Sequence, residues 1–325
     1  MRLLGLLKRI SGSVQRGRRT KEPIMNHEEV GFQLHQVLEK EELLALAARI
    51  KDNYPFCLQM YNTLLLTARG LNACLQYEIY VPRNDLDSHI IISRSLIEWE
   101  LMSLYCREEE IPLLIKVMKG SHFLDIVKEL PVNFLFISNY QVDAVLEAFQ
   151  EIFERRLQIK QSSCYVYETR QESPLRCPAG MKLQRLGRAG VQKLLEFNEY
   201  WKDAPLDLTC RLAENLPMLG IYLDPDVVEE KVIDFSDISF AEEEATPIAQ
   251  VGVSPYGTVG CLWVDVKYRR LGLGNLLVEV MGRLQMSEGY FPHGIVVYNN
   301  DASNKMFKTL PGWKKTHYTN KIIPA

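Results

Sequence analysis

The chain has 325 residues, which is enough for two domains of ordinary size, each with its own core. A hydrophobic fraction of 47% and a charged fraction of 24% are ordinary globular values and exclude a largely disordered chain. The net charge is −3, but all charged residues among 1–21 are basic, so the rest of the chain is strongly acidic. Such a body is poorly suited to bind phosphate backbones, which excludes nucleic acid as the default partner.

Residues 1–26 form a basic extension ahead of the expected folded part. One face of a helix would carry Leu3, Leu6, Leu7, Ile10 and Val14, arginines occupy the other face, and acids are absent before Glu22. This composition is typical of a mitochondrial presequence, so we expect a mitochondrial location, with the cytoplasm as the alternative. A translation start at Met25, which would omit this segment, stays open.

No apolar run reaches the roughly 20 residues needed to span a bilayer. The seven cysteines are scattered, without a C-x-x-C pair and without a histidine at the spacing of metal ligands. We therefore expect reduced thiols, no metal and no transmembrane segment.

Residues 27–170 alternate between helical and strand-like patterns, which predicts an N-terminal α/β domain. The expected helices cover 27–52, 58–69, 109–118, 122–129 and 140–155, and the expected strands cover 75–81, 90–92, 101–105, 134–137 and 164–167. A stretch rich in turn residues, 171–178, marks the expected domain boundary.

Residues 178–325 form the second predicted α/β domain. Its expected strands cover 181–186, 219–222, 248–253 and 259–264, and its first helices cover 189–200 and 207–215. An acidic insert at 224–244 holds nine acids and one base, and we expect a solvated loop, with a lid that selects a cationic substrate as the alternative. The two halves share an element order without a residue-level repeat, so a degenerate copy in the N-terminal half is a hypothesis.

The segment with the clearest chemistry runs from Leu262 to Gly274. A strand leads into a basic turn that contains Gly272, and an amphipathic helix follows. A helix N-terminus presents unpaired N–H groups and the positive end of a dipole, and glycines let the backbone approach a ligand closely. Arg269 and Arg270 add positive charge. The segment therefore predicts a phosphate or pyrophosphate site.

A strand at 294–298 follows this helix, and then come Asn300-x-x-Ser303-x-x-Met306-Phe307 and Gly312-Trp313. This region, about residues 250–320, resembles the core of the GNAT acyltransferase superfamily. The resemblance lies in the order of its parts: strand, R-x-x-G-x-G, helix, strand, N-x-x-S-x-x-M-F and Gly-aromatic. Three further strings resemble the glycine N-acyltransferase family, including its uncharacterised insect members: Asn198-Glu199-Tyr200-Trp201, Val266-Lys267-Tyr268-Arg269 and Asp301-x-Ser303-Asn304.

The resemblance implies a GNAT fold for the C-terminal domain and an acyl-CoA co-substrate, without a metal. It implies that the strand end at Val264 to Val266 pairs with the pantetheine arm, and that a main-chain N–H near Asp265 or Val266 stabilises the oxyanion. It also implies a set of residues that hold the pyrophosphate or line the cofactor: Arg269, Arg270, Leu271, Gly272, Leu273, Gly274, Asn300 and Ser303.

Two positions depart from the family pattern. The Glu that serves the family as general base falls on Thr258, and a hydroxyl is a poor base. Asp265 is the first replacement candidate, with a solvated turn residue as the alternative, while Tyr298 and His293 are weaker candidates and His293 is expected in a loop. The tyrosine that protonates the leaving thiolate in many GNAT enzymes is Phe307 here.

The sequence thus predicts an α/β protein of two similar-sized mixed parts, the C-terminal one a GNAT domain. We expect a monomer that transfers an acyl group from coenzyme A to glycine or another small amine, by direct attack on the thioester. Two alternatives stay open: an acetyltransferase for an aromatic amine or polyamine, and a catalytically silent acyl-CoA-binding or scaffold protein.

Overall fold

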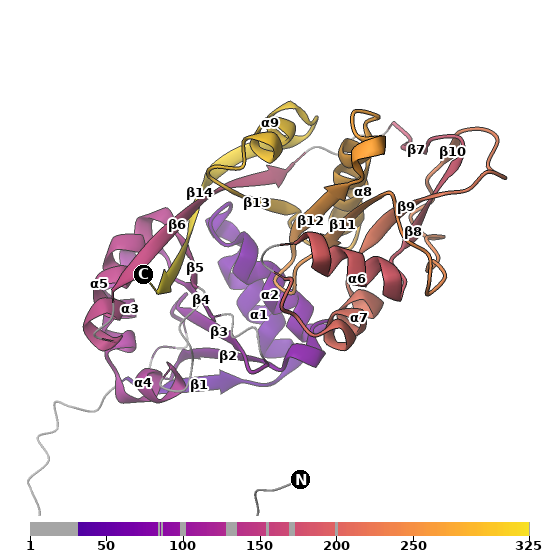
Figure 1. Cartoon of the computed structure of the whole chain (residues 1–325). Helices are drawn as coiled ribbons and strands as arrows, with labels where there is room; N and C mark the ends of the chain where they lie inside the picture. The colour runs from indigo at the N-terminus through magenta and orange to yellow at the C-terminus, as the bar shows by residue number, and fades with distance from the viewer. Residues whose placement is uncertain are drawn as a thin grey trace, which may run out of the picture. The chain divides into compact units, whose positions relative to one another are not determined.

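The computed structural model describes residues 32–83, 85, 87–97, 102–127, 135–153, 156–168, 173–198 and 201–324. The predicted presequence lies outside the described residues. Residues from Phe32 onward form one compact unit, shown in Figure 1. All seven cysteines are free thiols, as the sequence predicts.

One mixed sheet of twelve strands runs through the described part of the chain (Figure 1). From edge to edge its strands are β1 (Leu34–Val37), β2 (Tyr77–Pro82), β3 (Ile91–Ser95), β4 (Met102–Tyr105), β5 (Leu135–Ser138), β14 (Trp313–Pro324), β6 (Leu157–Tyr167), β13 (His293–Val297), β12 (Thr258–Val264), β11 (Ala249–Val253), β9 (Leu219–Leu223) and β8 (Met181–Arg185). Two short strands, β7 (Arg176–Cys177) and β10 (Lys231–Val232), pair separately.

The two predicted parts exchange their last strands. β6 precedes the predicted boundary, yet it lies between β14 and β13 and pairs antiparallel with both. β14 is the last strand of the chain, yet it pairs with β5 of the N-terminal part as well as with β6. The sheet is therefore continuous across the predicted boundary.

Helices cover both faces of this sheet (Figure 1). Neighbouring residues of one strand point to opposite faces, and accordingly Ile91 and Ile92 of β3 belong to different apolar cores. The first core contains α1 (Lys40–Ile50), α2 (Leu58–Ala68), α6 (Arg188–Phe197) and α7 (Leu206–Asn215). The second contains α3 (Ile111–Met118), α4 (Ser121–Val127) and α5 (Val142–Phe153), and the third contains α8 (Leu273–Ser287) and α9 (Asp301–Thr309). Because α2 and α6 share the first core, the two predicted parts are packed together.

The predicted helix over 27–52 is wrong for its first part. Residues 34–37 are β1, which pairs antiparallel with β2, and the helix begins only at Lys40. Leu34 and Val37 are buried in different cores, because residues three apart in a strand point to opposite faces, so their i, i+3 spacing here belongs to a short strand that is covered on both sides. The acidic stretch 224–244 is mostly loop, with β10 as its one described strand.

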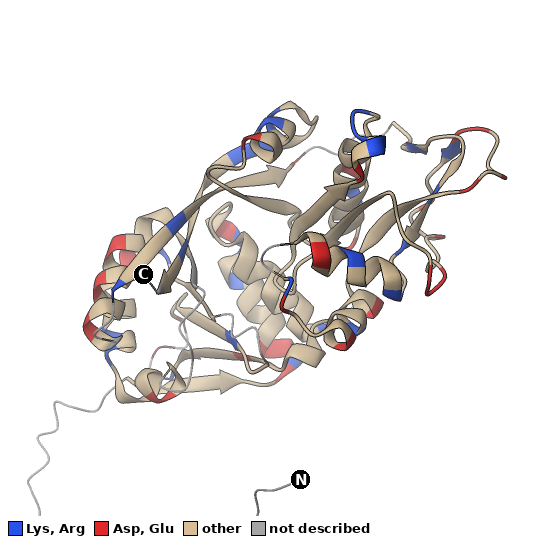
Figure 2. Ribbon diagram, in the orientation of Figure 1, with Lys and Arg blue, Asp and Glu red and all other residues tan. Residues whose placement is uncertain are grey.

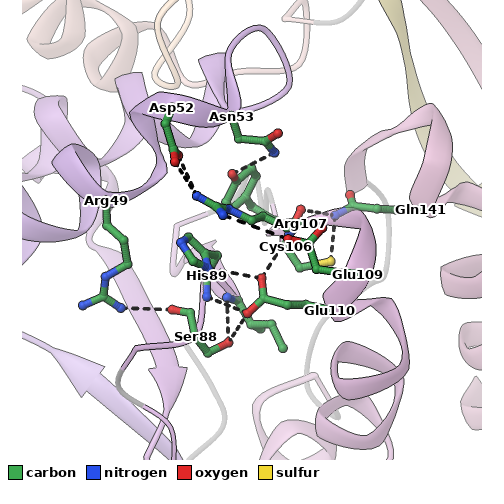
Figure 3. Close-up of polar contacts among 12 residues, drawn as sticks. Arg49, Asp52, Asn53, Ser88, His89, Cys106, Arg107, Glu109, Glu110 and Gln141 are labelled. Carbon is green, nitrogen blue, oxygen red and sulfur yellow. Dashed lines mark hydrogen bonds and ion pairs between the residues drawn. The ribbon is translucent and has the colours of Figure 1, made fainter.

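A polar network surrounds the corner that follows β4 (Figure 3). Glu110 accepts hydrogen bonds from the Arg107 N–H at 3.1 Å, the His89 N–H at 2.9 Å and the Ser88 hydroxyl at 3.0 Å. The Arg107 guanidinium donates to both carboxylate oxygens of Asp52, at 2.7 and 2.6 Å. These contacts join the turn after β4 to the 3-10 turn Lys51–Asn53, which follows α1, and to the segment that leads into β3, so the corner is a structural joint.

Candidate functional site

The sheet opens between β12 and β13. The two strands are parallel and pair only at Thr258↔His293 and Val259↔Gly294, after which they separate. A cavity of about 390 Å³ lies at this opening, a volume typical of small-molecule sites. It is lined by residues of β12 and β13, by α6 and α9, and by the exchanged strands β6 and β14.

β12 has a bulge beside the opening. Gln250 of β11 pairs with Trp263 and Gly252 pairs with Gly260, so β12 carries one extra residue between these pairs. Cys261, inside the bulge, has a φ of 54°, which is uncommon for a residue other than glycine. A bulge leaves backbone groups outside the ladder, and Cys261 lines the cavity. Burial raises the pKa of the Cys261 thiol to about 12, so this thiol is protonated at neutral pH.

β12 continues through a short 3-10 turn, η5 (Val266–Tyr268), to the N-terminus of α8. Gly272 caps this helix with a φ of 79°, a conformation that favours glycine. The backbone angle is the reason for this preference, since an added Cβ would meet nothing within 4 Å. A Cβ on Gly274 would lie 3.5 Å from Val264 Cγ2, an ordinary contact, so the protein itself leaves room there. Arg269 and Arg270 are exposed beside the helix end, and Figure 2 shows basic residues, in blue, in this turn. The turn therefore offers an anion the solvent-exposed, positive end of a helix.

Asp265 does not line the cavity. Its N–H donates to Ile248 O at 2.8 Å within the sheet, and its carboxylate accepts the Lys267 N–H at 2.9 Å as the cap of η5. The Asp265 amide is thus committed to the sheet and is not offered to an oxyanion. Val266 is 72% exposed beyond the strand end, and the Arg269 side chain donates to Val264 O at 3.1 Å, which ties the turn to β12.

Ser303 of α9 and Asn300, which precedes this helix, line the cavity. Asn300 Oδ1 accepts the Ser303 N–H at 3.1 Å, so the same residue caps α9. Phe307 stacks on Tyr165 with the ring centroids 5.1 Å apart. A Cβ on Gly294 would lie 2.7 Å from Phe307 Cζ, so the end of this ring contacts β13. Phe307 is therefore a packing residue of the cavity wall.

Thr258 lines the cavity where β12 and β13 are still paired. Its Oγ1 is 2.9 Å from Nε2 of His293. The expectation that His293 lies in a loop is wrong, because it is the first residue of β13 and only 1% exposed. Burial lowers the pKa of His293 to about 4. Tyr298, the other weaker candidate, is 68% exposed and does not line the cavity.

Two lysines that the sequence analysis missed also line the cavity. Lys160 of β6 lies directly opposite Lys321 of β14. Burial, together with the charge of Lys160, lowers the pKa of Lys321 to about 8. The signal that could have pointed to them is the polar run 160–163, which continues directly into the apolar strand 164–167.

Within the described ranges, no group of three or more His, Cys, Asp or Glu residues is arranged to hold a metal ion. Nor does that part of the chain contain a helix with the length and apolar character needed to cross a bilayer.

Comparisons with known proteins agree with this geometry. Residues 240–320 match the family model described as FR47-like protein. A Drosophila protein solved by X-ray crystallography is 16% identical, with a TM-score of 0.67 over 91% of this chain and 99% of its own. A putative acetyltransferase from Pyrococcus horikoshii is 10% identical, with a TM-score of 0.51 over 93% of this chain and 92% of its own. No curated protein is similar enough to match. The chain therefore shares its mixed α/β fold with these two structures.

Proposed function

We propose that this protein is an acyl-CoA-dependent N-acyltransferase whose acceptor is a small amine that carries a carboxylate, such as glycine. The observation that carries the proposal is the opening between β12 and β13, which leads directly to the exposed N-terminus of α8. An extended thiol arm fits between separating strands, and a pyrophosphate fits a helix N-terminus. One continuous ligand, an acyl-CoA, would occupy both.

The residues of the turn and the bulge have distinct roles in this proposal. The N–H groups from Arg270 to Gly274 would hold the pyrophosphate. Backbone groups of the bulge at Cys261, which the ladder does not use, would pair with the pantetheine arm and stabilise the oxyanion. The oxyanion is thus assigned to the bulge and not to the Asp265 N–H, because that N–H is bonded to Ile248 O.

Transfer would proceed by direct attack of the amine on the thioester. Cys261 is the thiol that lines the cavity, and its raised pKa of about 12 makes it a poor nucleophile at neutral pH. A covalent intermediate on this cysteine is therefore disfavoured.

The acceptor class is inferred from the charge of the cavity. Lys160 shares a face of β6 with Ser162 and Val166, since alternate residues of a strand point the same way. Val166 lies opposite His293, so the lysine pair Lys160 and Lys321 occupies the same face of the sheet as His293. Among the described residues that line the cavity none is acidic. Two cations and no anion favour a carboxylate and oppose a polyamine.

The acidic insert gives a polyamine acceptor no support. Its described residues do not line the cavity. Asp224 forms an ion pair with Lys182 at 3.4 Å, and Asp234 bonds to the Ser236 N–H at 2.9 Å within its own turn. These contacts are those of a solvated loop.

The test combines titration calorimetry with an assay of thiol release, on protein that starts at His27. We expect acetyl-CoA or benzoyl-CoA to bind in the micromolar range, and glycine to release thiol faster than tyramine or putrescine. K160M and K321M should raise KM for glycine about tenfold each, roughly 1.4 kcal/mol. K305M, on the exposed side of α9, is the matched control and should leave KM unchanged.

Each outcome has a separate meaning. Faster release with putrescine would reverse the acceptor assignment. Binding of coenzyme A without thiol release for any acceptor would establish the silent binder instead. The silent binder is the main alternative because Thr258 and Phe307 occupy the positions that are catalytic in the family that the sequence resembles. No binding at all would overturn the proposal.

A further inference from the structure

Thr258 separates the cavity from a buried imidazole. Thr258 lines the cavity, whereas His293 lies behind it, with its Nε2 2.9 Å from Thr258 Oγ1. The Thr258 N–H is bonded to Ser254 Oγ at 3.0 Å, which fixes the start of β12 in its turn. A group in the cavity can therefore contact the Thr258 hydroxyl, which in turn contacts His293.

The hydrogen bonds around His293 favour one tautomer. Its Nδ1 is 3.0 Å from Phe291 O, which can only accept, and 3.4 Å from Nδ2 of Asn62, which can only donate. Because the contact with the carbonyl is shorter and the Asn62 amide already donates to that carbonyl at 2.8 Å, we assign the proton of the neutral ring to Nδ1. Nε2 then carries the lone pair. It follows that the Thr258 hydroxyl donates to Nε2 and keeps its own lone pairs for a donor in the cavity.

The N-terminal part of the chain holds this arrangement through Asn62 of α2. Asn62 is fully buried, its Oδ1 accepts the Phe291 N–H at 3.0 Å, and its Nδ2 donates to Phe291 O at 2.8 Å. Asn62 also packs on Gly257, where an added Cβ would lie 2.5 Å from Asn62 Cβ. One side chain thus fixes both the carbonyl that orients His293 and the turn that carries Thr258.

The surroundings of His293 favour its neutral form. A second cavity, of about 30 Å³, is lined by His293 and by the titratable groups Tyr105, Cys164 and His317. Burial raises the pKa of Tyr105, raises that of Cys164 to about 12 and lowers that of His317 to about 4, so all three are uncharged at pH 7. The pKa of His293 is also lowered to about 4, so the lone pair on Nε2 is present at neutral pH and is lost only as the pH falls through that value.

We propose that Thr258 and His293 form a proton relay for acyl transfer, an inference that rests on the N-acyltransferase function proposed above. As the amine nitrogen bonds to the thioester carbonyl carbon, its proton passes to Thr258 Oγ1 and the hydroxyl proton passes to His293 Nε2. The C–S bond then breaks, and the proton returns through Thr258 to the sulfur. The products are an amide and a thiol, and the relay regains its starting state.

The relay explains why a threonine occupies the family's general-base position. Thr258 touches the acceptor and transmits the proton, while the imidazole behind it receives the charge. The ammonium nitrogen of the tetrahedral intermediate is far more acidic than a free alkylammonium ion, so a weak base with correct geometry is sufficient.

The first experiment is nitrogen-15 NMR of the imidazoles in the protein, with H293F used to identify the His293 signals. We expect the tautomer with the proton on Nδ1, and an Nε2 resonance that shifts in T258V. A proton on Nε2 would overturn the relay, whether or not the protein is active.

The second experiment measures turnover. T258V keeps the shape and removes the hydroxyl, and we expect kcat to fall about 100-fold, while T258S stays within a few-fold of the native protein. Coenzyme A affinity should change less than twofold in both. The double variant T258V/H293F should lose no more than T258V alone, because the two groups act as one unit.

The failures of the two proposals are distinguishable. Native turnover in T258V would overturn the relay alone and leave the N-acyltransferase function in place. Absence of thiol release from the native protein, with coenzyme A binding intact, would overturn the function and the relay with it. If H293F fails to fold, T258V and T258S still decide the matter.

Discussion

The corner after β4 and the corner after β12 occupy equivalent places in the two halves of the sheet, and they differ in chemistry. β4 pairs in parallel with β5 over two residue pairs, and β12 pairs in parallel with β13 over two as well. Each strand leads through a short 3-10 turn into a helix. The turn after β4 is Arg107-Glu108-Glu109-Glu110, whereas the turn after β12 carries Arg269, Arg270 and the two glycines.

This difference teaches that the sheet alone does not make the cofactor site. In the first corner, Glu110 satisfies three donors of its own chain and the acids would repel a phosphate (Figure 3). In the second corner, the helix end is open and the adjacent charges are positive (Figure 2). The proposed acyl-CoA site rests on strands that separate beside an open, basic helix end, and the described residues provide that combination after β12.

The largest expected effect comes from filling the open corner. G274L places a side chain at the start of α8, where the protein leaves room but a pyrophosphate would lie. We expect coenzyme A affinity to fall at least 100-fold, about 2.7 kcal/mol, in titration calorimetry. E109L, in the first corner, is the matched control and should bind coenzyme A normally. Equal affinity in both variants would show that the cofactor does not use the second corner.

Removal of the acid that closes the first corner should affect stability without affecting binding. E110A leaves two backbone N–H groups and the Ser88 hydroxyl without their acceptor, which destabilises the fold by roughly 2 kcal/mol. Urea unfolding should show this loss, while E108A, an exposed acid of the same turn, changes stability by less than about 0.5 kcal/mol. A loss of coenzyme A affinity in folded E110A would contradict a purely structural role for this corner.

A smaller effect is expected from one charge of the open corner. R270Q should weaken coenzyme A binding about fivefold, close to 1 kcal/mol, because one charge-assisted contact to phosphate is lost. The difference from the native protein should shrink at high salt, since exposed charges are screened. K116Q on α3, the helix that follows the first corner, provides the control and should bind as the native protein does. Salt-independent loss would indicate a change of backbone rather than of charge.

The smallest expected effect is on the pH dependence of carboxylate binding by the lysine pair Lys160 and Lys321. The first corner has no counterpart of this lysine pair. The pKa of Lys321 is lowered to about 8, so its charge is present below pH 8 and lost above it. Binding of N-acetylglycine, a product without a titrating amine, should weaken several-fold between pH 7 and pH 9. K321M should show a flat profile over this range. An equally steep profile in K321M would assign the dependence to another group.

The sequence was sufficient where the chemistry lies in one contiguous segment. The strand, the basic turn with glycines and the helix that follows are confirmed as elements, because each of them follows from residues within about fifteen positions. That this turn binds a phosphate stays a prediction. Asn300 and Ser303 line the cavity, and their role toward a cofactor stays a prediction as well. Asp265 was a reasonable candidate by position, but a strand end does not reveal that its amide is already bonded to Ile248.

Only the tertiary structure shows which groups from distant segments of the chain meet. Asn62 and His293 are 231 residues apart in the chain, and Lys160 meets Lys321 only because the two parts exchange their last strands. Local periodicity reports which face of a strand is apolar, but it does not report which strand lies beside it. The sequence by itself therefore determined the fold class and the order of strand, basic turn and helix at the proposed cofactor site. The tertiary structure decided which distant groups meet at the cavity, because strand pairing is set by long-range packing.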